Sequence, residues 1–245
     1  MITSIQNQKV KQWNKLKTKK ERIKTSSFLI EGFHLVEEAW KSNWQIHEII
    51  LQENIPLPSW CENFPVEIVT ESVFKTIAQT TTPQGIAAVI SMKKYHTYTG
   101  NQVLLVDEIQ DPGNLGTIIR TADAAGFATI ILGKGTVDMY NEKVIRATQG
   151  SLFHIPVIEA DLQEEITKLK QNDFAIWAAT LENAVHYTEL AVPEKTALIV
   201  GNEGAGINSN VMNLADQGVK IPIYGKAESL NVSIAAAILM YYIKN

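Results

Sequence analysis

Short apolar runs alternate along the chain with segments whose apolar residues recur at helical spacing. In the first third of the chain, the apolar runs at 28–31, 46–51, 66–69 and 85–92 predict strands. The segments FHLVEEA and SVFKTIA lie between these runs and predict helices. This alternation predicts a small α/β domain over residues 1–94.

A polar stretch without apolar periodicity follows at residues 93–101 and predicts a domain boundary. The remaining residues, 101–245, repeat continuous apolar runs with helical segments between them. Continuous rather than alternating apolar residues are typical of parallel strands that helices cover on both faces. We therefore expect a second α/β domain whose parallel strands are VLLVDEI, ATIILG, IPVIEA, FAIWAAT, ALIVG and VKIPI.

The net charge of −4 hides a strong asymmetry along the chain. Residues 1–25 carry a net charge of +7, which leaves −11 for the remainder. A basic segment on an acidic body suits contact with nucleic-acid phosphates, because each lysine that neutralises a phosphate releases condensed counterions. A solvated amphipathic helix explains the charge pattern equally well. Trp13, within this segment, is expected to serve packing rather than base stacking.

Composition and motif spacing disfavour several classes of function. The single cysteine, Cys61, excludes an internal disulfide and a thiolate cluster, and the five histidines lack ligand spacing, so we expect no metal. No apolar run reaches membrane length and the lysine-rich start lacks a signal-peptide core, so we expect a cytoplasmic protein with no membrane partner. The glycines of GNEGAGI do not have dinucleotide-binding spacing, and no phosphate-loop motif is present.

Candidate chemistry follows three predicted strands, because ligands of open α/β sheets bind at the carboxyl ends of the strands. In the first of these segments, DPGNLGTIIRTADAAGF, we expect Asn114 to cap a helix and the Arg120 side chain to lie over Gly116. The alternative is an exposed arginine paired with Asp123, which this segment alone favours. The second segment, GNEGAGI, places glycines around one acid, Glu203.

The third segment, residues 221–239, is expected to form a strand, a glycine turn and a buried helix that opens with Ser229, Leu230 and Asn231. Two explanations of this triplet stay open on pattern alone. The side chains can cap the helix, or they can form part of a ligand site at its positive end.

These three segments, in this order, resemble the three motifs of the SpoU/TrmH family of RNA ribose 2′-O-methyltransferases. The resemblance covers residues 103–245 and extends with less specificity over residues 2–32. It implies a parallel-sheet domain whose C-terminal segment threads a loop to form a deep trefoil knot, and which works as a homodimer. It also implies that a small, ribosomal-protein-like RNA-binding α/β domain precedes the knotted domain.

The resemblance implies S-adenosylmethionine as cofactor without a metal, and RNA rather than DNA as substrate. The additional N-terminal domain favours ribosomal RNA over tRNA. The implied catalytic residues are Asn114, Arg120, Glu203, Ser229 and Asn231. The implied cofactor contacts are Thr180, Leu181, Gly201, Asn202, Ile221 and Leu230. The expected RNA contacts are Lys9, Lys11, Lys15, Lys17, Lys19, Lys20 and Arg22.

Under this interpretation the triplet at 229–231 is a ligand wall rather than a cap. An arginine is an awkward general base because the guanidinium stays protonated in proteins, so we expect Arg120 to clamp a phosphate and align the ribose hydroxyl. The alternatives are a tRNA 2′-O-methyltransferase and a non-catalytic RNA-binding or ribosome-assembly factor. Arg120, Glu203 and Asn231 argue against the latter, because a pure binder does not need a buried polar site of this kind.

Overall fold

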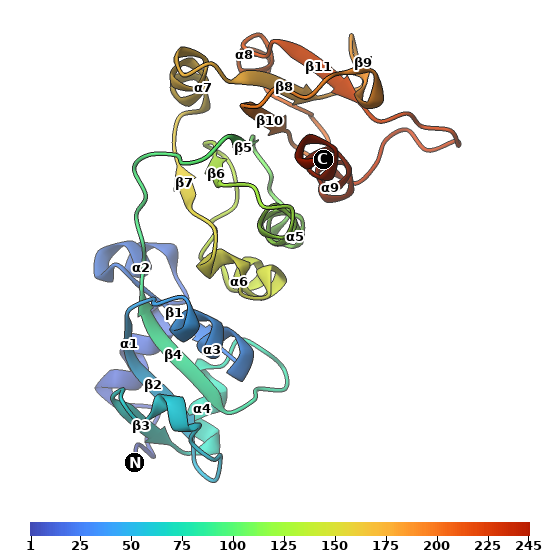
Figure 1. Ribbon diagram of the computed structural model, residues 1–245. Coiled ribbons are helices and arrows are strands. Elements are labelled where there is room, and N and C mark those ends of the chain that lie inside the picture. Colours follow the sequence, from blue (N-terminus) through green and yellow to red (C-terminus); the bar gives the residue numbers. More distant parts are fainter. The chain divides into compact units, whose positions relative to one another are not determined.

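The computed structural model describes residues 1–245 and divides into two compact units (Figure 1). The first unit comprises residues 1–93 together with residues 140–153. The second comprises residues 94–139 and 154–245. The assignment of an RNA-binding domain to residues 1–94 and of a methyltransferase domain to residues 101–245 stays a prediction. In the structure, the short segment at 140–153 belongs to the first unit.

The first unit is built on a four-stranded mixed sheet of order β1-β4-β2-β3. Strand β4 is antiparallel to both β1 and β2, and β2 is parallel to β3. The four predicted strands and the two predicted helices of this region are all present. The elements are α1 (Gln8–Lys15), α2 (Lys19–Thr25), β1 (Ser27–Glu31), α3 (Phe33–Lys41), β2 (Ile46–Gln52), the 3-10 helix η1 (Ser59–Cys61), β3 (Val66–Val69), α4 (Glu71–Ile77) and β4 (Ile86–Ser91).

The basic N-terminal segment is part of this folded unit rather than a free arm. It forms α1 and α2, and the apolar side of α1 packs into a core that includes residues of α4, β2 and β4. Trp13 is 2% exposed, and its indole Nε1 donates a hydrogen bond to Glu48 Oε1 at 2.7 Å. The packing role expected for Trp13 is therefore confirmed.

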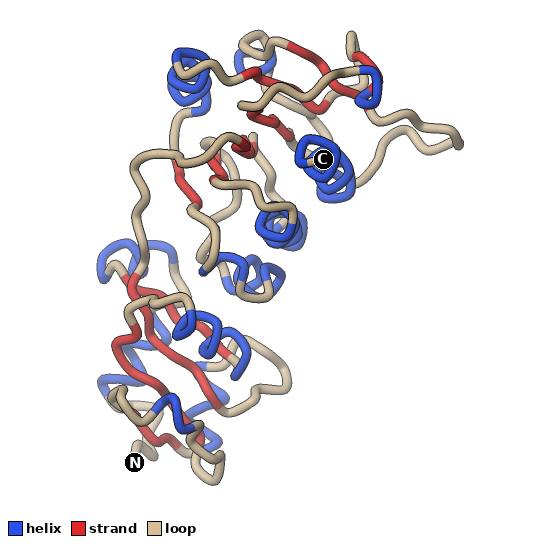
Figure 2. The backbone as a smooth tube through the Cα atoms, in the orientation of Figure 1, coloured by secondary structure: helices blue, strands red, loops and turns tan.

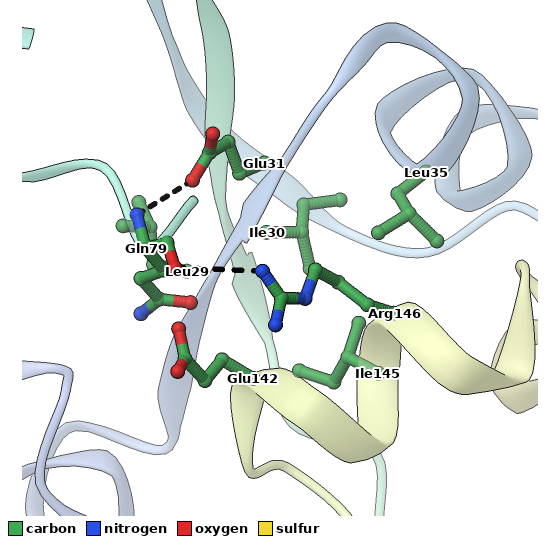
Figure 3. A pocket seen from close by; sticks show the side chains of 8 residues that line it. All are labelled: Leu29, Ile30, Glu31, Leu35, Gln79, Glu142, Ile145 and Arg146. Atoms are coloured by element: carbon green, nitrogen blue, oxygen red, sulfur yellow. Dashed lines mark hydrogen bonds between the residues drawn. The ribbon is translucent and has the colours of Figure 1, made fainter. Parts of the chain in front are cut away.

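Residues 140–153 contain α6 (Glu142–Thr148) and the 3-10 helix η2 (Ser151–Phe153), and they pack on the first sheet. Figure 3 shows the Arg146 guanidinium of α6 beside Gln79 and Glu31 around a small cavity of about 10 Å³. Arg146 Nη1 donates to the Gln79 carbonyl at 3.4 Å, and the Gln79 N–H donates to Glu31 at 2.7 Å. At the other end of the segment, Trp44 Nε1 donates to the Phe153 carbonyl at 3.0 Å.

The second unit is built on a seven-stranded sheet of order β7-β6-β5-β10-β8-β11-β9, whose strands are labelled in Figure 1. Every strand pair in it is parallel, as the continuous apolar runs predict. Its strands are β5 (Gln102–Val106), β6 (Thr129–Leu132), β7 (Val157–Glu159), β8 (Ala175–Ala179), β9 (Val185–His186), β10 (Thr196–Val200) and β11 (Gln217–Lys220). Its helices are α5 (Pro112–Ala124), α7 (Leu162–Gln171), α8 (Ser209–Met212), α9 (Val232–Lys244) and the 3-10 helix η3 (Tyr187–Glu189).

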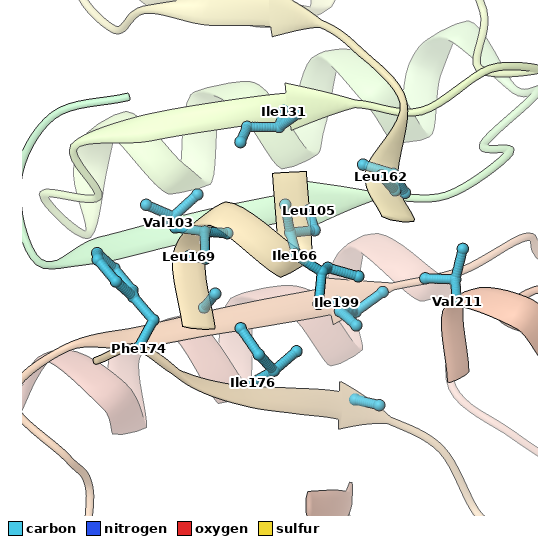
Figure 4. Packing of buried hydrophobic residues seen from close by; sticks show 12 residues of the cluster. Val103, Leu105, Ile131, Leu162, Ile166, Leu169, Phe174, Ile176, Ile199 and Val211 are labelled. Carbon is cyan, nitrogen blue, oxygen red and sulfur yellow. The ribbon is translucent and has the colours of Figure 1, made fainter. Parts of the chain in front are cut away.

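Apolar side chains cover both faces of this sheet. On one face, leucine and isoleucine side chains of α7 and Val211 of α8 meet Leu105, Ile176 and Ile199 (Figure 4). On the other side, α5 and α9 pack against each other and α9 contacts β10. No helix is both long and apolar enough to cross a membrane.

The end of one expected strand and the start of one expected helix are wrong. Residues 221–223 are not a strand, because β11 ends at Lys220 and Pro222 has no N–H to continue the ladder. Helix α9 begins at Val232 rather than at Ser229, and an irregular loop connects β11 to it (Figure 2).

Candidate active site

Four neighbouring strands of the second sheet end at one edge. Strands β5, β10, β8 and β11 are adjacent and parallel, and Val106 lies beside Val200, Ile199 beside Ala178, and Val219 beside Ala179. The residues that follow these strands therefore line the same edge of the sheet. They include Thr180, Gly201 and Ile221, which the family resemblance implies as cofactor contacts.

The loop after β10 closes tightly on itself. Asn202 and Gly206 exchange two backbone hydrogen bonds at 2.9 and 3.0 Å. The Asn202 side chain accepts hydrogen bonds from the N–H groups of Gly204 and Ala205 at 2.9 Å, and donates to the Glu108 carbonyl at 2.8 Å. A Cβ atom at position 201 would lie 2.5 Å from the Gly206 carbonyl carbon, so only glycine fits at Gly201.

A buried carboxylate fastens the far end of the same loop. Asp107 follows β5, is 4% exposed, and accepts a hydrogen bond from the Asn208 N–H at 2.7 Å. Burial raises the pKa of Asp107 above its ordinary value, and the Asn208 N–H partly offsets this rise. Asp107 is not among the site residues predicted from the sequence, although an acidic side chain directly after a continuous apolar strand is a signal that could have found it.

Side chains from all three motif segments form one chain of hydrogen bonds. Glu203 Oε1 accepts from Asn114 Nδ2 at 2.9 Å, and Asn114 Oδ1 accepts from Asn231 Nδ2 at 3.0 Å. Asn231 Oδ1 accepts from the Ser233 N–H at 2.9 Å. The structure thus brings together three of the five predicted catalytic residues. This polar site is open to solvent at Glu203 and Asn231 rather than buried as expected.

One backbone N–H fixes the orientation of both asparagine amides. The Ser233 N–H can only donate, so it requires the oxygen of Asn231 and turns the Asn231 NH₂ toward Asn114. Asn114 must then present its oxygen to Asn231 and its NH₂ to Glu203. Asn231 is therefore both the N-cap of α9 and a member of this chain of hydrogen bonds, so the cap interpretation is right for this residue. Ser229 and Leu230 precede the cap and are exposed.

Asn114 does not cap its own helix, contrary to expectation. The N-cap of α5 is Asp111, whose Oδ1 accepts from the Asn114 N–H at 2.7 Å, and Pro112 occupies the first helical position. Because Asp111 supplies the cap, the Asn114 side chain is free to join Glu203 and Asn231.

Arg120 lies on α5 and is exposed, and its side chain makes no hydrogen bond or ion pair within the chain. The expected alternative, a pair with Asp123, is not formed; Asp123 instead bonds His154 Nδ1 at 2.9 Å. Arg120 is also not bonded to Asn114, Glu203 or Asn231. An exposed guanidinium whose side chain has no partner within the chain is available to an anionic ligand.

The remaining predicted cofactor residues offer apolar surface at the same edge. Leu181 is 51% exposed and Leu230 is 37% exposed, so both side chains are accessible to a ligand. Thr180 and Ile221 are partly buried, and the Thr180 N–H donates to the Val219 carbonyl at 3.1 Å.

The predicted RNA-contacting residues fall into two groups. Lys9 bridges Glu48 and Glu67 at 2.8 and 2.7 Å, and hydrogen bonds to these carboxylates raise its pKa. Lys17 donates to the Thr76 carbonyl at 2.9 Å, and burial lowers its pKa. Arg22 is 6% exposed and donates to the Leu16 carbonyl at 2.9 Å. These three residues hold the first unit together, whereas Lys11, Lys15, Lys19 and Lys20 are exposed.

Two family models match the chain. Residues 101–241 match the SpoU rRNA Methylase family, and residues 7–88 match the MRM3-like substrate binding domain. The first match covers the whole polar site, from Asn114 to Asn231.

Individual proteins also match over nearly the whole chain. A Bacillus subtilis protein named 23S rRNA (guanosine(2553)-2′-O)-methyltransferase RlmP is 48% identical, over 99% of this chain and 98% of its own. The AdoMet-bound rRNA methyltransferase from Sinorhizobium meliloti is 32% identical, with a TM-score of 0.88 over 99% of this chain and 96% of its own.

A TrmH/SpoU tRNA-modifying enzyme from A. aeolicus is also similar, at 27% identity and a TM-score of 0.53, over 60% of this chain and 75% of its own. The three motif segments, the parallel sheet that holds them and these matches lead to one conclusion: the chain belongs to the SpoU rRNA methylase family.

Proposed function

We propose that this protein transfers a methyl group from S-adenosylmethionine to a ribose 2′-hydroxyl of 23S ribosomal RNA. The observation that carries the proposal is the hydrogen-bond chain from Glu203 through Asn114 to Asn231, which unites the three motif segments at one sheet edge. The whole-length similarity to the Bacillus subtilis 23S rRNA enzyme supports ribosomal RNA as the substrate and a guanosine as the target nucleotide. The tRNA-modifying relative matches a smaller share of the chain, which favours ribosomal RNA over tRNA.

The sheet edge fits S-adenosylmethionine. Exposed Leu181 and Leu230 and partly buried Ile221 offer apolar surface for an adenine ring and a methionine chain, and the loop at 201–206 offers backbone groups. Thr180, Leu181, Gly201, Asn202, Ile221 and Leu230 are the residues that would hold it. The cofactor supplies a methyl group on a sulfonium, and this chemistry needs no metal.

The protein's own residues would position the RNA. Arg120 binds the phosphate next to the target ribose and aligns the 2′-hydroxyl with two guanidinium N–H groups. Asn114 is held by Glu203 on one side and Asn231 on the other, so its position beside the ribose is fixed before the RNA binds. Ser229, in the exposed loop ahead of α9, offers a hydroxyl that can accept a hydrogen bond from the ribose 2′-hydroxyl. As the O–CH₃ bond forms and the S–CH₃ bond breaks, S-adenosylhomocysteine would leave and the hydroxyl proton would pass to solvent.

The knot, the dimer and the compartment belong to the same proposal. The match of residues 101–241 to the SpoU rRNA Methylase family supports the trefoil knot that the family resemblance implies. A bacterial ribosomal RNA substrate supports a cytoplasmic location. The exposed apolar side of α9 supports a homodimer.

The dimer yields a prediction about α9. Ile234 and Tyr241 are 51% and 50% exposed and lie seven residues apart, on the same side of the helix. The double substitution Ile234→Lys/Tyr241→Lys is expected to convert the dimer to a monomer, because it places two charges in an apolar interface. Sedimentation velocity measures the mass directly. Leu57→Lys, at an exposed leucine of the first unit, is the control and should leave the dimer intact. A wild-type monomer at micromolar concentration would contradict the dimer.

The proposed activity is tested by transfer of a tritiated methyl group from S-adenosylmethionine to 23S ribosomal RNA and to total tRNA in parallel. Label is expected only in the ribosomal RNA, and nuclease digestion should release it as a 2′-O-methylguanosine-containing product. Label in tRNA alone would establish the tRNA alternative. Binding of RNA without any transfer would establish the non-catalytic alternative.

A further inference from the structure

Glu108 has a backbone conformation that glutamate seldom adopts. Its φ is 54°, in the left-handed region, where residues other than glycine are uncommon. The other non-glycine residues with positive φ are asparagines or an aspartate, which tolerate this region, or the helix C-caps Ser26 and Gln149. Neither explanation applies to Glu108, which lies two residues after β5 at the edge of the proposed methyl-transfer site. Backbone strain of this kind occurs preferentially at functional sites.

Two neighbouring loops fix Glu108 in place. The Asn202 side chain, from the loop after β10, donates to the Glu108 carbonyl at 2.8 Å. The loop after β6 is bonded to the next residue, because the Val137 N–H donates to the Ile109 carbonyl at 2.8 Å. A Cβ atom at Gly135 of that loop would lie 3.0 Å from Glu108 Cγ, so the glutamate side chain lies against the loop backbone. The fold therefore sets the direction of the Glu108 side chain.

The fold does not use the Glu108 carboxylate. This carboxylate makes no hydrogen bond or ion pair within the chain, and the residue is partly exposed. Two other acids of the same edge do have partners, since Asp107 accepts from the Asn208 N–H and Glu203 accepts from Asn114. The strained backbone at Glu108 is thus not compensated by a contact of its carboxylate within the protein, and both carboxylate oxygens are available to a ligand.

The order of the strands indicates which part of a nucleotide would meet Glu108. The strands lie in the order β6-β5-β10-β8-β11, and the proposed cofactor residues follow β10, β8 and β11. Glu108 follows β5 and lies against the loop after β6, on the side away from most of those residues. A ribose at Asn114 has the cofactor residues on one side and Glu108 on the other, where the base of the same nucleotide can lie.

The chemistry of a carboxylate restricts the base. A carboxylate only accepts hydrogen bonds and repels phosphates, so it selects a base edge that carries donors. Guanine is the RNA base whose Watson–Crick edge presents two adjacent donors, N1–H and the N2 amino group, which match the two oxygens of a carboxylate. We infer that Glu108 determines base specificity by binding the Watson–Crick edge of the target guanine. The inference rests on the proposed function and explains how the site distinguishes guanosine from the other nucleosides.

Glu108→Gln tests this contact with little change in shape. The glutamine amide offers one acceptor and one donor group, so it opposes the guanine N2 amino group and matches the edge of adenine. The substrates are two synthetic fragments of Bacillus subtilis 23S ribosomal RNA with guanosine or adenosine at position 2553, the position in the name of the relative. For methyl transfer to the guanosine fragment, kcat/KM should fall about 5- to 150-fold, which corresponds to one bidentate base contact. The adenosine fragment should be methylated at or above the wild-type rate.

The matched control is Glu164→Gln, which removes the same charge from an exposed position of α7 and should behave as the wild type on both fragments. Glu108→Gly separates specificity from folding. Glycine adopts positive φ without steric cost, so this variant should unfold at or above the wild-type temperature and still lose the preference for guanosine. The Kd for S-adenosylmethionine, measured by calorimetry, should not change.

Three results would overturn the inference. Equal losses on the two fragments would show that Glu108 has only a structural role. An unchanged preference for guanosine would show that another group reads the base. Weaker cofactor binding with an intact preference for guanosine would place the carboxylate at the ammonium group of S-adenosylmethionine instead.

The inference and the proposed function can fail separately, because base preference is also measurable without methyl transfer. Fluorescence anisotropy with labelled versions of the two fragments gives their Kd values. A wild-type chain that transfers no methyl group to any RNA, but prefers the guanosine fragment and loses that preference in Glu108→Gln, overturns only the enzymatic proposal. A wild-type chain that methylates 23S ribosomal RNA, and whose Glu108 variants keep the preference for guanosine, overturns only the inference.

Discussion

Arg120→Ala is expected to slow methyl transfer to RNA by about 10²–10³-fold and to leave the Kd for S-adenosylmethionine unchanged. Arg120 is an exposed cation on α5 with no partner within the chain, so its removal breaks no internal contact and should not alter stability. What it removes is the group that aligns the ribose hydroxyl and binds the adjacent phosphate. Single-turnover transfer of labelled methyl groups measures the rate, and calorimetry measures the cofactor Kd.

Thr117→Ala, at an exposed position of the same helix, provides the control and should transfer methyl groups at the wild-type rate. Arg120→Lys separates a clamp from a general base. A lysine keeps the charge but loses the planar pair of donors, so a clamp predicts a large loss of rate with an unchanged pH profile. Near-full activity of the lysine variant, with a lowered apparent pKa in its pH–rate profile, would show instead that residue 120 acts as a base.

The convergence of the three segments could be predicted from the sequence because it depends on local patterns. Continuous apolar runs specify parallel strands, and parallel strands bring the loops that follow them to one edge of the sheet. That rule predicts that the loops carrying Asn114, Glu203 and Asn231 meet, and the structure joins these three side chains by direct hydrogen bonds. The resemblance to a known family then supplied the cofactor and the reaction, which no periodicity could supply.

Two of the errors arise where a role depends on a residue distant in sequence. Asp107 is a structural tie only because Asn208 lies beside it in the fold. Lys9 belongs to a basic run in the sequence, yet in the structure it bridges two carboxylates on neighbouring strands. Charge counted along a chain therefore overstates the number of cations available to RNA. Which lysines of this segment remain exposed to RNA depends on how α1 and α2 pack, and the sequence alone does not show that packing.

Gly201→Ala is expected to destabilise the second unit and to lower methyl transfer by about 10²-fold. A Cβ atom at this position would lie 2.5 Å from both the Gly206 carbonyl carbon and the Ile207 nitrogen, and backbone atoms cannot yield as a flexible side chain can. The two hydrogen bonds between Asn202 and Gly206 must open to make room. Overpacking of this kind costs about 1–3 kcal/mol, and each kcal/mol lowers the Tm of a domain of this size by about 2–4 °C.

The same loop carries Glu203 and Asn202. Its displacement therefore disturbs both the chain of hydrogen bonds from Glu203 through Asn114 to Asn231 and the proposed cofactor site. The matched control is Gly204→Ala in the same loop, where a Cβ would meet nothing closer than Asn202 Oδ1 at 3.7 Å. Thermal unfolding, cofactor calorimetry and single-turnover transfer should all report a large loss for Gly201→Ala and wild-type values for Gly204→Ala. Equal effects of the two alanines would mean that general loop flexibility, and not the close approach at Gly201, determines the activity. A loss of stability with unchanged cofactor binding would separate the loop from the cofactor site.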